Sequence, residues 1–83
     1  MTNEQIETYL EVKQRRNKEL SIHFKDRRTV TGIFIEGSDY VELKSKNLWR
    51  IVNNARLEEW KQTHDVNLSR IFNGLSFTRL SED

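Results

Sequence analysis

The side chains that could carry out chemistry are few, and their spacing favours binding over catalysis. The two histidines, His23 and His64, stand far apart, and neither belongs to a metal-ligand spacing such as H-x-x-x-H. The adjacent Glu58 and Glu59 would point to opposite faces of a strand, so they do not form a general acid and base pair. Three scattered glycines make no phosphate loop. None of the following serines lies in a G-x-S-x-G nucleophile turn: Ser21, Ser38, Ser45, Ser69 and Ser76.

We therefore predict that the protein is not an enzyme and has no cofactor and no metal site. Both histidines are expected to be polar surface residues. The remaining candidates for function are basic and aromatic side chains, which bind rather than react.

Basic side chains fall into two groups along the chain. Lys and Arg number 14 against 13 Asp and Glu, a formal net charge of +1, so composition alone does not indicate a nucleic acid partner. The distribution is more informative, because one group lies at the end of the predicted first helix and the other follows a predicted strand: Lys13, Arg15, Arg16 and Lys18, then Lys25, Arg27 and Arg28. Such groups either meet phosphates or are the solvated ends of elements.

Length and composition limit what must position these side chains. The 83 residues can make one domain, residues 1–83, and a domain of this size buries only about 60 to 65% of its unfolded surface. Without Cys it has neither disulfides nor thiolate metal sites, so self-association is the natural way to bury more surface. No apolar run approaches about 20 residues and no signal peptide is evident, so we expect a cytoplasmic protein with no membrane partner.

A helix should open the chain at residues 2–16. Thr2 followed three residues later by Gln5 has the form of a capping box, and basic residues follow where the last turn should be. The apolar stripe is narrow, so the helix should lie across one open end of the remaining fold: Ile6, Tyr9 and Leu10.

From Leu20 the apolar period changes to two, which predicts β-strands. The second strand, residues 29–36, is apolar on both faces and carries Gly32 in its middle, which permits the bend of a tightly closed barrel. Five short strands after one helix are typical of a small β-barrel covering residues 18–62. The predicted strands are 20–24, 29–36, 40–45, 48–52 and 56–61.

Two segments have alternative interpretations. Residues 55–63 could instead form a helix capped by Asn54. Residues 64–83 carry too many apolar side chains for a disordered tail, so we expect a C-terminal extension packed on the outside of the barrel. Within it, Asn73-Gly74 is either the turn of a hairpin, which we favour, or the stop of a short helix.

A long stretch of the chain carries a pattern of alternation around a mid-strand glycine. From Leu20 it reads L-S-I-H-F-K-D-R-R-T-V-T-G-I-F-I-E-G-S-D-Y-V-E-L. This stretch resembles the first half of the Hfq branch of the Sm-like family, and with the preceding helix and L-W-R-I-V-N-N-A-R-L the likeness covers about residues 2 to 62. The matching core positions are Leu20, Ile22, Phe24, Val30, Gly32, Phe34, Val41 and Leu43. The resemblance implies a mainly β fold, a short helix followed by a strongly bent five-stranded Sm-like (SH3-like) barrel.

The resemblance also implies a partner, single-stranded RNA, and a homo-oligomer, a hexameric ring. Tyr40 matches the aromatic position that stacks a uridine base in that family, and a ring would present one such face per subunit. The family's tyrosine-lysine-histidine signature should fall near residues 52–54, where Asn53 and Asn54 would instead hydrogen-bond base edges. Phosphates would be met by the basic residues at the end of the helix: Arg15, Arg16 and Lys18.

A second register and a second function remain open. I-F-N-G-L-S-F resembles the second Sm motif, with Asn73 in place of its arginine, and would make residues 65–80 the last two strands and 48–62 an insertion. We favour the first register because it needs no long insertion. In the ring we expect residues 48–52 to pair with 56–60 of the next copy. The rival to RNA binding is a protein-interaction or structural ring, which the near-zero net charge favours.

Overall fold

The computed structural model describes residues 1–12 and 15–82, and its first element is helix α1, Asn3–Glu11. The predicted capping box is confirmed, since the Gln5 amide donates to Thr2 Oγ1 at 3.2 Å and the Thr2 amide donates to Gln5 Oε1 at 3.0 Å. The helix ends at Glu11 and does not reach Arg16, because no apolar residue of the stripe follows Leu10 and further turns would bury nothing. Lys13 and Gln14 lie outside the described residues.

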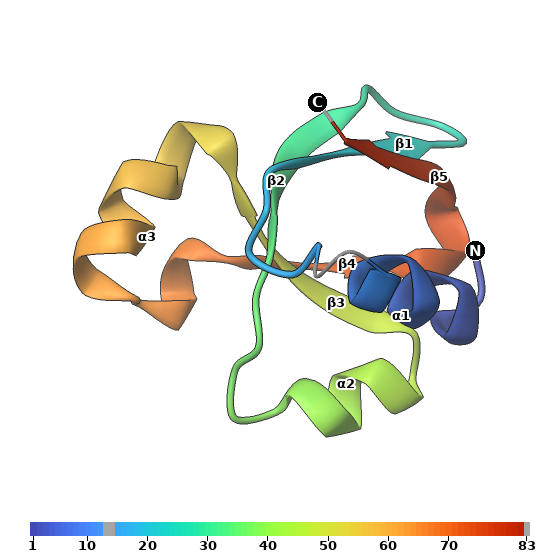
Figure 1. Cartoon of the computed structure of the whole chain (residues 1–83), viewed down its shortest axis with the longest axis horizontal. Helices are drawn as coiled ribbons and strands as arrows, with labels where there is room; N and C mark the ends of the chain where they lie inside the picture. The colour runs from blue at the N-terminus through green and yellow to red at the C-terminus, as the bar shows by residue number, and fades with distance from the viewer. Residues whose placement is uncertain (13–14, 83) are drawn as a thin grey trace.

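In the described residues, five strands form one antiparallel sheet in the order β4-β3-β2-β1-β5 (Figure 1). The predicted five-stranded sheet behind an N-terminal helix is therefore confirmed. Three of the strands lie where the period of two predicts them. The bounds are β1 Leu20–Phe24, β2 Val30–Phe34, β3 Leu48–Asn53, β4 Arg70–Asn73 and β5 Phe77–Glu82.

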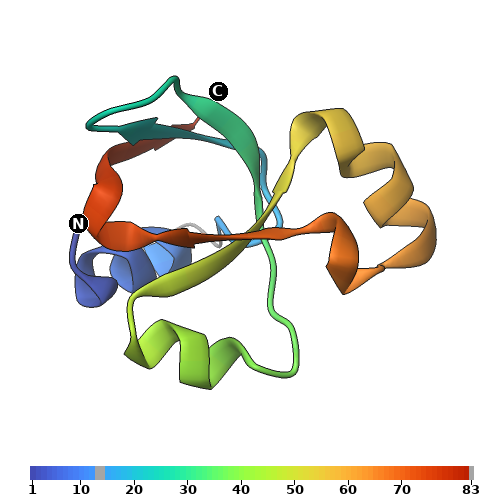
Figure 2. The ribbon, with the colours of Figure 1, turned by 180° about the vertical axis from the view of Figure 1, so that it is seen from behind.

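The sheet is strongly curved, and its two edges approach each other (Figure 2). The 3-10 turn η4, Gly74–Ser76, alone joins β4 to β5, which are the two edges of the sheet. The rings of Phe24 in β1 and Phe72 in β4 lie 5.6 Å apart, although two strands separate β1 from β4 in the sheet. The hydrogen-bonded ladder of the described strands does not close, because β4 and β5 are not paired. The structure therefore has an open, curved sheet where a closed barrel was predicted.

Strand β2 is buried on both faces, as its apolar pattern predicts. Phe34 packs in the main core, whereas Ile33 and Ile35 pack with Val52 in a second cluster. At Gly32 the backbone of β3 comes so close that an added Cβ would lie 3.0 Å from the Val52 carbonyl carbon and closer still to its oxygen. The mid-strand glycine thus permits this approach of β2 to β3.

Two of the predicted strands are helices. Residues 40–45 form α2, Tyr40–Ser45, and residues 56–61 lie mainly in α3, Leu57–Thr63. The strand prediction fails at α2 because Val41, a predicted core position, is 73% exposed. At α3 the helical alternative is right, since Leu57 and Trp60 have the i, i+3 spacing that turns both toward the second cluster. Its predicted cap is wrong, because Arg56 is the N-cap residue and no side chain caps the helix. Before α3, the 3-10 turn η2, Asn54–Arg56, is capped by the Asn53 side chain.

The C-terminal segment is part of the sheet, and its prediction as an outer extension is wrong. After the 3-10 turn η3, Val66–Leu68, β4 pairs with β3 and β5 pairs with β1, so the segment is neither a hairpin nor a short helix. Burial explains the difference, because Phe77 and Leu80 complete the main core at 1% and 7% exposure. The second register places the last two strands correctly. Its insertion over residues 48–62 is wrong, because β3 occupies residues 48–53.

The predicted pairing of residues 48–52 with 56–60 of another copy is also wrong. β3 already has β2 and β4 as its neighbours, and residues 57–63 are helical.

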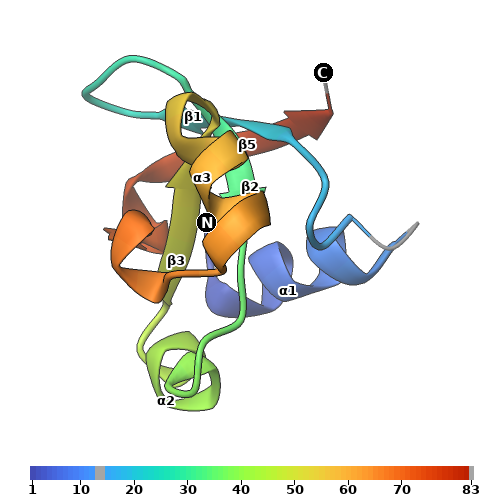
Figure 3. The same ribbon diagram turned by 90° about the vertical axis from the view of Figure 1, so that its left-hand side faces the viewer.

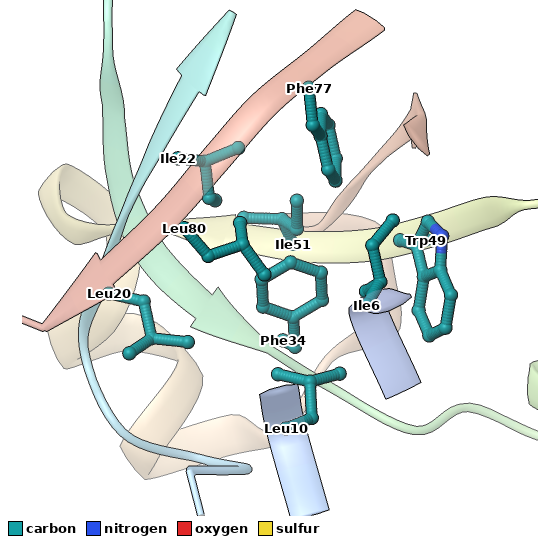
Figure 4. Packing of buried hydrophobic residues seen from close by; sticks show 9 residues of the cluster. All are labelled: Ile6, Leu10, Leu20, Ile22, Phe34, Trp49, Ile51, Phe77 and Leu80. Atoms are coloured by element: carbon teal, nitrogen blue, oxygen red, sulfur yellow. The ribbon is translucent and has the colours of Figure 1, made fainter. Parts of the chain in front are cut away.

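In the main core, Ile6 and Leu10 of α1 pack onto the inner face of the curved sheet (Figure 4). The helix lies across one end of the sheet, as its narrow stripe predicts. The buried residues of this main core are Ile6, Leu10, Leu20, Ile22, Phe34, Trp49, Ile51, Phe77 and Leu80.

Candidate functional site

Tyr40, the predicted stacking platform, begins α2 and is held in contacts with its own chain. Arg16 Nη1 donates a hydrogen bond to the Tyr40 hydroxyl, and the Arg16 guanidinium lies 5.0 Å from the centre of the ring. Lys44 Nζ lies 5.6 Å from the same centre, and the Trp49 ring meets Tyr40 edge to face at 6.2 Å. The half-buried ring therefore helps to attach α2 to the sheet.

The arginines predicted to meet phosphates are paired within the chain. Arg15 Nε donates to Glu82 Oε1 at 2.9 Å, and the Arg15 guanidinium lies 4.0 Å from the centre of the Tyr9 ring. Arg16 pairs with Glu36 at 2.8 Å. Their side chains are only 15% and 23% exposed, so both charges serve the fold around the end of α1. Lys18, the third member of the group, is exposed.

The two predicted base-contacting amides lie at the other end of β3. Asn53 Oδ1 accepts from the Ala55 amide at 2.9 Å, which begins the η2 turn, and Asn54 is exposed in that turn. Tyr40 packs on Trp49 near the start of the strand, and Trp49 and Asn53 are roughly 13 Å apart along an extended strand. The structure therefore does not bring Tyr40 together with Asn53 and Asn54.

A pocket of about 310 Å³ lies at the Asn53 end of β3, and the sequence did not identify it as a site. Its lining residues come from the β1–β2 connection, the start of β2, the end of β3, the turns η2 and η3, and β4. We call it the arginine pocket. Its lining residues are Arg27, Val30, Ile51, Asn53, Ala55, Arg56, Asn67, Leu68, Ser69, Arg70 and Phe72.

The register of β3 and β4 explains why Arg70 faces this pocket. Ile51 lies opposite Arg70 and Trp49 lies opposite Phe72, and residues directly opposite in a sheet share a face. Ile51 and Trp49 are buried in the main core, so Arg70 and Phe72 belong to the inward-facing row. Ile71, between them, faces outward and is 47% exposed. Arg70 therefore places a positive charge at the boundary between the core and solvent.

Positive charge dominates the arginine pocket. Three of its lining residues are arginines and none is acidic. Among the described residues, Arg27 and Arg70 take part in no salt bridge. Arg56 pairs with Glu59 at 3.6 Å, but both side chains are more than half exposed, so water weakens that attraction. The Arg27 guanidinium lies 5.2 Å and 5.4 Å from the ring centres of Phe24 and Phe72, within cation–π distance.

Helix α1 does not cover this end of the sheet. Figure 3 shows the β1–β2 connection on one side of the molecule and α1 on the other. The helix closes the end at Ile6 and Leu10, whereas the end at Arg27 and Arg70 stays accessible.

Some residues of this site could be recognised from the sequence. Arg27 belongs to the second basic group, and Asn53 was singled out for a different reason. The favoured hairpin and the second register both include a strand here, and the alternation of Arg70 and Phe72 would place them on one face of it. The pairing of β4 with β3 brings them to the same pocket as Asn53, and the curvature of the sheet brings Phe72 near Arg27.

Neither histidine shows a catalytic arrangement. His23 Nε2 lies 3.0 Å from Ser81 Oγ and its Nδ1 lies 3.3 Å from Thr29 Oγ1 on the sheet, so this half-buried ring is bonded to its neighbours. His64 is exposed and ends α3 with a left-handed backbone, φ 52°. Over residues 1–12 and 15–82, no group of three or more His, Cys, Asp or Glu side chains could hold a metal ion. In the same residues, no helix has the length and apolar character needed to span a membrane.

Comparisons of the chain with protein-family models, with curated proteins and with solved structures find no match.

Proposed function

We propose that this protein binds single-stranded RNA without catalysing a reaction, and that the arginine pocket holds the strand. The observation that carries the proposal is a pocket lined by three arginines and Phe72, with no acidic lining residue. Proteins that bind single strands combine cations along the backbone with aromatic rings on which bases stack. Arginine suits this task because its planar group binds phosphate oxygens in pairs and also stacks on rings.

This proposal places the contacts differently from the sequence-based prediction. Phosphates are met by Arg56 and Arg70, because Arg15 and Arg16 already have intramolecular carboxylate partners. Bases stack at Phe72 and not at Tyr40, and Asn53 is the one predicted site residue that lines the pocket.

We further propose that the curved sheet belongs to the Sm-like family, in its Hfq-like branch. Three features support this assignment: the short N-terminal helix, the strong curvature of the five-stranded sheet, and Gly32 at the close approach of β2 and β3. The I-F-N-G-L-S-F stretch that resembles the second Sm motif spans most of β4, η4 and the start of β5.

The proposed homo-oligomer, a hexameric ring by resemblance, would use the two edges of the sheet. In the described residues these edges are β4 and β5, and pairing β4 of one copy with β5 of the next would satisfy both ladders. Ile71 and Leu75, exposed at 47% and 61%, would add apolar contact beside β4. Light scattering at high micromolar concentration tests the assembly, and a strictly monomeric mass would exclude it.

A protein-interaction or structural ring is the second candidate. The exposed apolar side chains Val41, Ile71 and Leu75 favour it, because a contact with another protein would remove them from water. This candidate predicts assembly without any affinity for RNA.

The decisive experiment measures binding of labelled U-rich and A-rich single strands by fluorescence anisotropy at about 50 and 200 mM salt. The parent should bind and should weaken as salt rises, because bound phosphates release counterions. Arg70→Ala should weaken binding about tenfold, since a charge-assisted hydrogen bond is lost. Arg79→Ala is the matched control, because this exposed arginine of β5 carries the same charge outside the pocket. A parent that binds neither strand excludes the proposal.

A further inference from the structure

We infer that the arginine pocket takes one nucleotide unit of the strand, its base against Phe72 and its phosphate at Arg70 and Arg56. This inference rests on the proposed function and adds to it the unit that is recognised. The shape, the polar rim and the rigidity of one wall each support it.

The pocket has the size and layering of a small-ligand site. Its volume of about 310 Å³ lies near the lower end of the roughly 300 to 1,000 Å³ found for such sites. Val30, Ile51 and Leu68 supply apolar lining, and Phe72 adds an aromatic ring. A duplex or a helix would not enter this volume, whereas a single unstacked base is small enough to do so.

The cations lie where a phosphate attached to that base could meet them. Arg70 belongs to the inward-facing row, next to the apolar side chains of that row. Arg56 lines the pocket from the η2 turn. Arg27 is already stacked near Phe72, at 5.4 Å from the ring centre, so it can extend the stacking surface for a base.

Two amides on the rim can read a base edge. Asn53 Oδ1 is occupied by the Ala55 amide at 2.9 Å, which leaves its Nδ2 group as a donor in a fixed orientation. Asn67 is exposed and lines the pocket from η3, and its side chain carries both a donor and an acceptor. Together they offer donors and an acceptor to the polar atoms of one base.

The wall that carries these amides is held in place before any ligand binds. The backbone amide of Asn67 donates to Asp65 Oδ1 at 2.9 Å, and this bond fixes η3 in the way that the Asn53 side chain fixes η2. Between the two turns, α3 packs Leu57 and Trp60 onto the second cluster. A rigid wall loses little conformational entropy on binding, so a small ligand can be held by few contacts.

The experiment is an amide NMR titration of the full chain with three probes: uridine 5′-monophosphate, uridine and inorganic phosphate. The monophosphate should shift the amides of residues 51–56 and 67–72 and should bind at least about tenfold more tightly than either other probe, because base and phosphate contacts act together. Arg70→Ala should lower monophosphate affinity about tenfold and leave uridine affinity unchanged.

The variant Asn67→Ala should weaken uridine and the monophosphate alike, and Arg79→Ala should change neither. Arg70→Gln replaces Arg70→Ala if the alanine variant does not fold, since it keeps side-chain bulk without charge. RNA binding that depends on Arg70, with no monophosphate shifts in the pocket, overturns the nucleotide subsite and leaves the proposed function standing. Monophosphate binding in the pocket without RNA binding supports the subsite and refutes the proposed function. Inorganic phosphate that binds as tightly as the monophosphate overturns the subsite, because the base then contributes nothing.

Discussion

The backbone amide of Gly74 donates to the carbonyl of Asn47 at 2.8 Å, and this bond ties the turn between the two edge strands to the start of β3. Asn47 is held in turn, since its Oδ1 accepts from Trp49 Nε1 at 2.8 Å and its Nδ2 donates to the Met1 carbonyl at 2.9 Å. The three contacts join the N-terminal residue, the start of β3 and η4.

Gly74→Ala should destabilise the protein by about 1 to 3 kcal/mol, the usual cost of overpacking a core. An added Cβ would collide with the Asn47 side chain and lie 2.6 Å from Ile6 Cδ1. Urea denaturation followed by circular dichroism measures the change in the free energy of unfolding. Gly37→Ala is the control, because its Cβ would meet Asp39 Oδ1 at 3.1 Å and Val66 Cγ2 at 3.3 Å, which small shifts relieve. Equal losses in the two variants would contradict the tight packing at Gly74.

Ile6→Ala and Val41→Ala should differ widely in their effect on stability. Ile6 is fully buried beneath the curved sheet, so its truncation should cost about 2 to 5 kcal/mol. Val41 is 73% exposed on α2, so its truncation should change the free energy of unfolding by less than about 0.5 kcal/mol. Chemical denaturation of both variants checks this. A large loss at Val41 would instead favour the predicted strand at residues 40–45.

The parts of the fold that depend on neighbouring residues in the sequence could be predicted. The Thr2 capping box and the alternation of Leu20, Ile22 and Phe24 are local signals, and both elements form where expected. Residues 40–45 are too short to separate the two periods, because Val41 and Leu43 fit one face of a strand and Tyr40 and Leu43 fit an i, i+3 helix face.

The candidate site could not be predicted in the same way, because its assembly depends on distant pairings. Arg27 and Arg70 are far apart in the sequence, and they line one pocket only because the sheet curves β1 toward β4. The apolar residues of the C-terminal segment showed that it must be buried. They did not show that it supplies the two edge strands of the sheet.

Stability should fall in acid through the ion pair of Asp39 and Arg50. Arg50 donates to both Asp39 carboxylate oxygens, at 3.0 and 2.7 Å, and these hydrogen bonds lower the pKa of Asp39 below its ordinary value of 3.8. Because the folded pKa is the lower one, the pair stabilises the fold above pH 3.8, and this contribution is lost as the pH falls through the folded pKa.

Urea denaturation at a series of pH values from neutral to below 3.8 measures this contribution. Asp39→Asn and Arg50→Gln should each remove the same part of the acid dependence, and the double variant should remove no more than either. Additive losses would show that the two side chains act independently.

Tyr40→Ala should lower stability without weakening RNA binding, and this result would separate the arginine pocket from the site that the resemblance implies. The Tyr40 ring packs on Trp49 and its hydroxyl accepts from Arg16, so loss of the side chain loosens α2.

By contrast, Phe72→Leu keeps an apolar side chain in the pocket and removes the aromatic ring, so affinity for a U-rich strand should fall about tenfold. Anisotropy titrations of folded protein, checked by circular dichroism, compare the two variants. The variant Arg15→Ala with Arg16→Ala should likewise leave the salt dependence unchanged, because both charges are paired with carboxylates in the chain. A loss of affinity in Tyr40→Ala with none in Phe72→Leu would move the RNA site back to Tyr40.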